Sequence, residues 1–227
     1  MHMSDMDYTY YGFRNCVGAF FEMPTSDARK LLPSHLEPLE MQHERSILAL
    51  TCFEFTESEV GHYFEVVLAV IVPPMVEPSK PLPKAAFFPF CVGTSSEASR
   101  LHAIERWHLP HYMSDLDISM TESGDAMEVT VRDGDTPVLD FTVTKHEYAP
   151  TKNLYNAFTV EAGADAKFKA NIYMEAPHSE HEEENGSLTL YEHAMTEGLT
   201  IEDVNTYPFR EQWYQAGQQT FEPLLEL

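Results

Sequence analysis

The chain has 227 residues, of which 43% are hydrophobic, so it is long enough to bury a sizeable core in one domain. Its 14 lysines and arginines against 37 aspartates and glutamates give a formal net charge of -23. This charge repels nucleic acid and anionic lipid, so we expect neither nucleic acid nor a membrane as a partner. Three scattered cysteines, short apolar runs and a start without signal-peptide features predict a cytoplasmic protein.

In chain order, the first predicted element is a short helix over 26–32, which begins with capping residues and stops before Pro33. Apolar and alternating runs rich in β-branched and aromatic residues predict strands over 47–55 and 63–72. Six prolines between 73 and 89 predict an irregular loop, and an apolar strand is expected over 87–93. A Ser-Ser pair and apolar residues at helical spacing then predict a helix over 95–106.

The second half of the chain favours antiparallel strands, with turn residues between the first three. They are predicted over 117–121, 126–131, 138–143, 155–160, 167–174 and 187–193. The acidic segment 178–186 is interpreted as an exposed hairpin loop, and 201–225 as helical around Pro208. These elements predict one α+β domain over 1–227, with a large antiparallel β-sheet or barrel-like cavity flanked by a few helices.

Four stretches of the sequence, taken in order, carry a family resemblance. They are Ala28 to Glu40, Gly61 to Glu65, Ile104 to Tyr112 and Leu188 to Met195. Their order and spacing resemble the acetoacetate decarboxylase superfamily, and the likeness runs from Tyr10 to Leu225. The resemblance implies a large antiparallel β structure around a central cavity. It also implies assembly into oligomers, so we expect a homo-oligomer.

The resemblance fails at the residue that defines the family's best-known reaction. Decarboxylases of this kind form a Schiff base on a lysine that follows a proline at a helix end. Here His111 and Tyr112 follow Pro110, and none of the seven lysines stands in that place. We therefore interpret the chain as a divergent member that lacks the Schiff-base lysine. Lys84, in the proline-rich loop, is an alternative amine, but a solvated role is favoured for it.

Two residues are implied to lie in the cavity by the resemblance alone. Arg14 matches an arginine near the substrate carboxylate, and Glu65 matches a glutamate in the same cavity. Arg14 would bind an anionic oxygen through parallel hydrogen bonds. The alternative is a buried Arg14–Glu65 ion pair whose only role is structural.

The helix exit, whose sequence is ERWHLPHY, supplies further candidates. An imidazole moves protons near neutral pH, so His111 and Glu65 are predicted to exchange protons with substrate while Tyr112 holds a carbonyl oxygen. The alternative for His111 is simple packing beside a tryptophan. Other predicted substrate-binding residues are Glu105, Trp107 and Tyr63.

A metal site is the competing interpretation of the same stretch. His102, His108 and His111 have suggestive spacings, but three or four ligands must converge on an ion and the proline interrupts the helix. We therefore expect no metal and no cofactor.

Two functions remain open at this point. The first is an enzyme that acts on a small or medium carbonyl compound, such as a keto acid or polyketide-like metabolite, by lysine-independent proton transfer. Lyase, dehydratase, isomerase and cyclase activities all fit this chemistry. The second is a noncatalytic binding protein that kept the cavity and lost the lysine. Both predict a small-molecule carbonyl or carboxylate ligand.

Overall fold

The computed structural model describes residues 8–164 and 166–227. Their helices are α1 (Thr25–Leu31) and α2 (Glu97–Trp107), with 3-10 turns η1 (Gln42–Glu44), η2 (Ala194–Thr196) and η3 (Ile201–Asp203). Their strands are β1 (Thr9–Pro24), β2 (Arg45–Glu57), β3 (Tyr63–Val72), β4 (Ala85–Thr94), β5 (His111–Asp115), β6 (Asp117–Ser123), β7 (Ala126–Asp133), β8 (Thr136–Thr144), β9 (Ala149–Val160), β10 (Lys167–His181), β11 (Ser187–Leu190), β12 (Arg210–Phe221) and β13 (Leu225–Glu226). Within these residues, no helix is long and apolar enough to cross a membrane.

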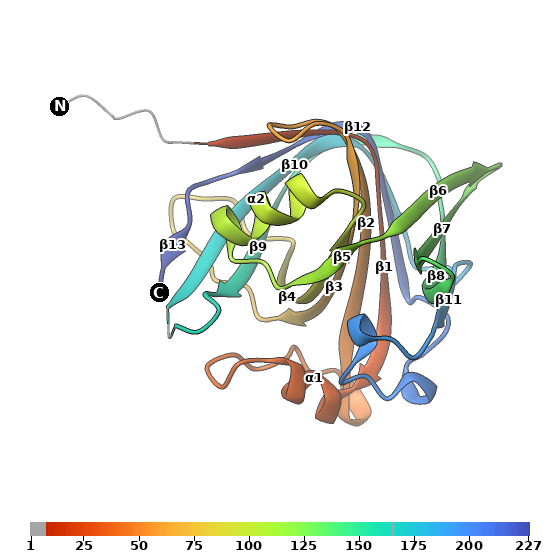
Figure 1. The fold of residues 1–227 in the computed structure, drawn as a ribbon, viewed down its shortest axis with the longest axis horizontal. Coiled ribbons are helices and arrows are strands. Elements are labelled where there is room, and N and C mark those ends of the chain that lie inside the picture. Colours follow the sequence, from red (N-terminus) through yellow and green to blue (C-terminus); the bar gives the residue numbers. More distant parts are fainter. Residues whose placement is uncertain (1–7, 165) are drawn as a thin grey trace.

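Seven strands close into a barrel. Their order is β12-β1-β2-β3-β4-β9-β10, and β10 pairs with β12 to complete the ring. Neighbouring strands run antiparallel except for β4 and β9, which pair in parallel. Figure 1 shows α2 and β5 lying across the front of this barrel. The predicted α+β fold with a barrel and few helices is confirmed.

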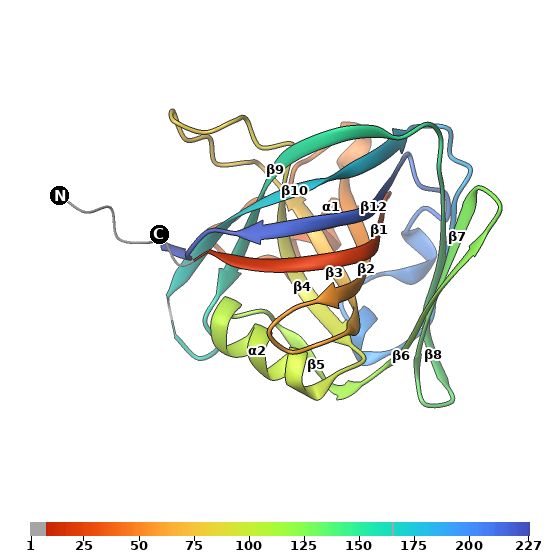
Figure 2. The same cartoon turned by 90° about the horizontal axis from the view of Figure 1, so that it is seen from above.

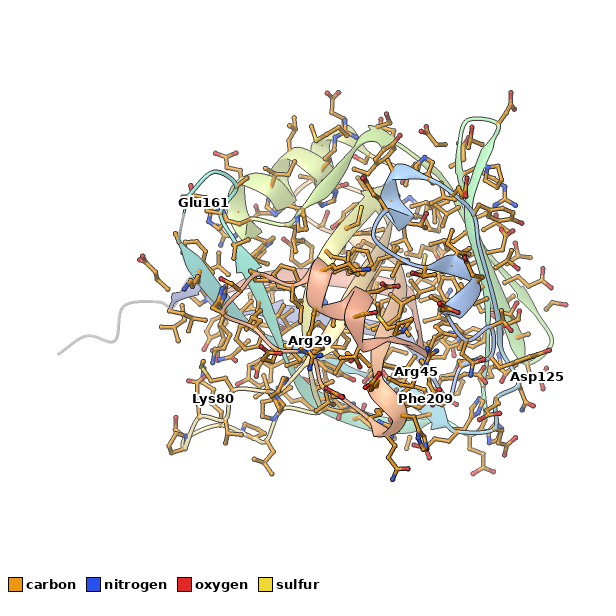
Figure 3. The ribbon with its side chains drawn as sticks, turned by 90° about the horizontal axis from the view of Figure 1, so that it is seen from below. Arg29, Arg45, Lys80, Asp125, Glu161 and Phe209 are labelled. Carbon is orange, nitrogen blue, oxygen red and sulfur yellow. The ribbon has the colours of Figure 1, made fainter. Side chains whose placement is uncertain are left out.

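A second sheet, in the order β11-β8-β7-β6, is antiparallel throughout. Figure 2 shows β6, β7 and β8 standing beside the barrel as a separate layer. One hydrophobic cluster joins the two layers, because it contains Val129 and Phe141 of the second sheet together with Val17 and Leu50 of the barrel wall. Figure 3 places Asp125, in the β6–β7 turn, and Lys80, in the β3–β4 loop, on opposite sides of the molecule.

The barrel wall is buried on both of its faces where it meets the second sheet. In β1, Val17 packs into the core between the layers, while Cys16 and Gly18 line the inside of the barrel. Alternate residues of a strand point to opposite faces, so such strands need apolar side chains at nearly every position. This explains why β2 and β3 appear in the sequence as almost continuous apolar runs.

Helix α2 has a capping residue at each end, and the cap at its start lies in the predicted Ser-Ser pair. The Ser96 side chain accepts a hydrogen bond from the Ser99 amide, and His108 stands in the left-handed region with φ 54°. A left-handed residue after the last turn satisfies the terminal carbonyls and reverses the chain. The chain then enters β5, whose His111 pairs with Val92 of β4.

The C-terminal prediction is wrong, because 210–221 is a strand and not a helix. β12 pairs with β1 on one side and with β10 on the other, so it closes the barrel. Its sequence, REQWYQAGQQTF, contains few β-branched residues. Its many glutamines interrupt the alternation of apolar and polar residues that would indicate a strand. Non-local pairing with two neighbours overrides this weak local preference.

The expected acidic hairpin loop at 178–186 is also partly wrong. Strand β10 continues to His181, and both His178 and His181 are buried. Their burial comes from pairing with β12, which the sequence pattern did not reveal.

Candidate active site

A cavity of about 130 Å³ lies inside the barrel. Apolar and aromatic side chains make up most of its wall, among them Phe20, Phe53, Phe87, Ile172 and Met174. A wider depression of about 680 Å³, bordered by residues 190–202, lies outside the barrel on the surface. The inner cavity is the better candidate site, because its wall is mostly apolar and carries only a few polar groups, as small-molecule sites do.

Glu65 is the carboxyl group of this cavity. It comes from β3, is 8% exposed and lines the cavity wall. Among the residues that the structure describes, none forms an ion pair or hydrogen bond with its side chain. Burial therefore raises the pKa of Glu65 to about 8, because the charged form loses its hydration without gaining a partner. At neutral pH most molecules carry a protonated Glu65.

A chain of neutral hydrogen-bonding groups faces the same cavity. Asn153 Nδ2 donates to Tyr214 Oη at 2.7 Å, and the hydroxyls of Tyr214 and Tyr155 lie 2.5 Å apart. Tyr155 Oη donates a longer bond of 3.4 Å to Gln212 Oε1. Burial raises the pKa of both tyrosines, so both stay protonated. Tyr155, Gln212 and Tyr214 line the cavity together with Thr51, so its wall carries one carboxyl and three hydroxyls among the described residues.

Arg14 does not enter the cavity. Its side chain is 67% exposed, and Nη1 lies 2.7 Å from Glu54 Oε1. The register of β1 against β2 shifts between Phe13 and Asn15, so Arg14 lies at a bulge. The expected Arg14–Glu65 pair is therefore corrected to an Arg14–Glu54 pair on the outside of the barrel.

His111 and Tyr112 lie in β5, beside the cavity wall but not in its lining. The His111 ring is largely buried, and within the described part of the chain neither ring nitrogen has a hydrogen-bond partner. Burial, assisted by nearby Arg100, lowers the pKa of His111 to about 4. Tyr112 Oη instead donates to Asp133 Oδ2 at 2.6 Å. The proton transfer predicted for His111 and the carbonyl contact predicted for Tyr112 gain no support from these positions.

Trp107 and Tyr63 belong to the aromatic cluster next to the cavity. Trp107 Nε1 donates to Tyr11 Oη at 2.8 Å, and its ring lies 4.5 Å from that of Phe221, which lines the cavity. Tyr63 packs against Phe55 at 4.9 Å between ring centroids. Both support the wall from behind. Glu105 is exposed on α2 and does not line the cavity.

Neither lysine nor arginine is found among the described residues that line the cavity. Lys84 pairs with Glu180, and the fully buried Lys169 pairs with Glu77. On β10, Ile172 and Met174 face the cavity, so the odd-numbered Lys169 points to the other face of the sheet. An amine for Schiff-base chemistry is thus missing from the described wall.

The histidines of the helix exit do not form a metal site. His102 Nε2 lies 2.8 Å from Tyr11 Oη, and the ring of His108 stacks on Phe168 at 4.6 Å. These contacts direct the two rings toward different neighbours.

Sequence reasoning missed Tyr155, Gln212 and Tyr214. Tyr155 begins a predicted strand but carries no motif around it, and the other two lie in the segment that was predicted as helical. A correct strand assignment for 210–221 would have placed Gln212 and Tyr214 on one face by their spacing of two.

The fold is thus a closed barrel whose inner cavity carries one buried carboxyl with no partner among the described residues. The family model described as acetoacetate decarboxylase matches residues 3–205. The chain therefore belongs to the acetoacetate decarboxylase family. No curated protein sequence matches it closely enough to count as a relative.

Solved structures share the fold at low identity. An acetoacetate decarboxylase from Legionella pneumophila is 17% identical with a TM-score of 0.64, over 96% of this chain and 89% of that one. The enduracididine biosynthesis enzyme MppR, in complex with pyruvate, is 10% identical with a TM-score of 0.63, over 96% and 89%. An acetoacetate decarboxylase-like enzyme from Sphingomonas wittichii is 9% identical with a TM-score of 0.63, over 99% and 94%.

Proposed function

We propose that this protein is an enzyme that binds a small neutral carbonyl compound in the barrel cavity and transfers a proton at the carbon next to the carbonyl. The observation that carries the proposal is Glu65, a buried carboxyl that faces an apolar cavity without a partner. Perturbed acids in enclosed cavities are typical of acid–base catalysis. A pKa near 8 gives a carboxylate that is a much stronger base than an ordinary one.

The cavity wall favours a neutral substrate over a keto acid. A substrate carboxylate would enter an apolar space without a cationic partner, at a cost of several kcal/mol. Arg14, the expected partner for such an anion, forms its ion pair with Glu54 on the outside. We therefore narrow the expected ligand from a carbonyl or carboxylate compound to a neutral ketone, aldehyde or ester.

In the proposed step, the Glu65 carboxylate removes a proton from the carbon next to the carbonyl, which leaves protonated Glu65 and an enolate. The Tyr155 hydroxyl, whose bond to Gln212 is long, turns to donate to the enolate oxygen. Return of a proton from Glu65 to carbon restores the carbonyl compound, or completes an isomerisation if it returns at another carbon. Because only the ionised form is a base, the rate is expected to rise about tenfold per pH unit below pH 8 and to level off above it.

The test is deuterium exchange from solvent into a panel of neutral ketones, each paired with a carboxylate analogue of similar size. We expect exchange into the neutral members, and a loss of about 10²- to 10⁴-fold in Glu65→Gln with ligand affinity largely kept. Glu54→Gln is the matched control, because Glu54 is a buried glutamate outside the cavity. Equal loss in both variants, or exchange only into the carboxylates, would contradict the proposal.

Borohydride trapping tests whether a lysine forms a covalent intermediate with the ketone. A lysine iminium would be reduced to a stable adduct of the ketone and the protein, whereas proton transfer by Glu65 leaves nothing to trap. We expect no adduct by mass spectrometry. A covalent adduct would overturn the mechanism and identify a relocated amine.

A noncatalytic binding protein is the second candidate function. It is favoured by the cavity wall itself, where Glu65 is accompanied only by neutral groups in the described part of the chain. A pure binding protein would bind the same neutral ketones and would exchange deuterium no faster than buffer. The same experiment therefore separates the two functions.

A further inference from the structure

A cluster of possible metal ligands lies on the outside of the fold, away from the cavity. His146, His181 and Glu183 each offer a ligand atom, and these atoms lie within 4.8 Å of one another. His146 precedes β9, and His181 ends β10. Figure 2 shows the end of β10 beside the start of β9, above the second sheet. Among the described residues, this is the one group of at least three such side chains at that spacing.

His181 is already oriented as a metal ligand would be. It is 8% exposed, and its Nε2 donates to the Thr144 carbonyl oxygen at 2.9 Å. This bond puts the ring proton on Nε2 and makes Nδ1 the nitrogen with a lone pair, and histidine ligands are commonly fixed by such a bond from the other ring nitrogen. The contact that Nδ1 makes with the Glu183 amide is long, at 3.4 Å. An ion at Nδ1 would replace a weak bond by a strong one.

The other two ligands approach from the surface. His146 Nε2 lies 3.1 Å from Glu183 Oε2, close to the separation of about 3.3 Å between two ligands of a tetrahedral zinc ion. The His146 and His181 rings are stacked, with centroids 4.2 Å apart and planes 15° apart. Nearly parallel rings cannot both direct a lone pair at one ion, so His146 must turn. Its side chain is 42% exposed and is free to do so.

The surroundings favour a cation. The segment that carries two of the ligands, HSEHEEENG, contains four glutamates, and local negative charge raises the concentration of cations. Fully buried Glu211 lies behind His181, with its Oε1 3.9 Å from Nδ1. Glu211 accepts bonds from the amides of Thr144, Asn185 and Gly186, so it holds the backbone around the cluster in place.

We infer that His146, His181 and Glu183 form a zinc-binding site that ties the segment between β8 and β9 to the end of β10. Two imidazoles and one carboxylate suit zinc and similar first-row ions better than calcium or magnesium, which prefer oxygen ligands. Water would complete a four-coordinate shell. The site is independent of the cavity and of the function proposed for it.

The test uses the full chain without a histidine tag, stripped with a chelator and titrated with zinc chloride in a calorimeter. We expect one equivalent per chain with a dissociation constant in the micromolar range or below. Zinc at 100-fold above this constant should raise the unfolding midpoint by roughly 5–10 °C. Cobalt(II) at the same site should show the visible absorption of a four- or five-coordinate ion.

Variants of the exposed ligands keep the test independent of folding. His146→Gln and Glu183→Gln are each expected to weaken zinc binding at least tenfold and to abolish the cobalt absorption. His62→Gln is the matched control, because His62 is an exposed histidine 3.5 Å from a glutamate and belongs to no group of three possible ligands among the described residues. The inference is overturned if zinc binds no tighter than 100 µM, or if the double variant His146→Gln/Glu183→Gln binds as the unaltered protein does.

Discussion

At the scale of residues, the burial of Glu65 has a consequence for stability as well as for chemistry. Its carboxyl loses a proton near pH 4.5 in the unfolded chain and near pH 8 in the folded protein. Between these values the unfolded state is ionised and the folded state is not, so ionisation favours unfolding increasingly as pH rises. This contribution is absent below pH 4.5 and complete above pH 8.

We therefore predict that Glu65→Gln becomes more stable, relative to the unaltered protein, as pH rises from 5 to 8. The relative gain over these three pH units is at most about 4 kcal/mol, since one pKa unit corresponds to about 1.4 kcal/mol. Denaturant unfolding of both proteins at the two pH values measures it. A difference that does not change with pH would mean that the folded protein accommodates the Glu65 charge.

The family resemblance predicted that Glu65 lies in the cavity, and in the structure Glu65 lines the cavity wall. Arg14 was matched by the same reasoning, yet a one-residue shift at a bulge turns it to the outside. Sequence spacing counts residues and cannot show a bulge. His111 was correctly located at the helix exit, but the face on which it lies depends on how β5 pairs with β4.

At the scale of elements, strands that carry strong local patterns were predicted well. The prediction over 63–72 matches β3, and that over 95–106 overlaps α2 with its Ser96 cap. β1 received no prediction and 210–221 received the wrong one, although the two strands pair with each other along the barrel wall. Both owe their conformation to partners far away in the sequence, so local propensity carries little information about them.

Strand β12 also contains a glycine whose place leaves no room for a side chain beside β10. Gly217 pairs with Phe13 beside the β1 bulge. A Cβ there would overlap that of Ala176 and lie 2.6 Å from the Glu175 carbonyl oxygen. Gly217→Ala is therefore expected to lower the free energy of unfolding by about 1–3 kcal/mol, as overpacking does.

Denaturant unfolding measures this effect, and Gly18→Ala is its control. A Cβ at Gly18 would have the Leu50 carbonyl oxygen as its nearest neighbour, at 3.7 Å, so that change should shift the free energy by less than about 1 kcal/mol. Equal effects at the two positions would show that backbone entropy, and not the close approach of β10 and β12, determines the cost.

At the scale of the whole molecule, the net charge of -23 acts against compactness. Like charges repel more strongly in the folded protein, and salt screens them over a Debye length that falls from about 10 Å at 0.1 M to about 3 Å at 1 M. We predict that the unfolding midpoint rises between 0.05 M and 1 M sodium chloride. Thermal scans at constant pH measure it. A midpoint that falls with salt would show that the surface ion pairs outweigh the repulsion.

The family and the barrel were predictable because they rest on order and spacing along the whole chain. Assembly into a homo-oligomer stays a prediction, which sedimentation of the full chain can measure. The cavity chemistry was less predictable, since the polar groups that accompany Glu65 come from β2, β9 and β12 and converge only when the barrel closes.

The two faces of the barrel wall are under different constraints during evolution. In β1, Cys16 and Gly18 face the ligand space, while Val17 and Ala19 belong to the core shared with the second sheet. Residues that face the cavity can therefore accept substitutions that change ligand preference, while the alternate residues, which face the core, maintain the fold. Such a division allows the residues that face the cavity to change while the packing that maintains the fold is kept.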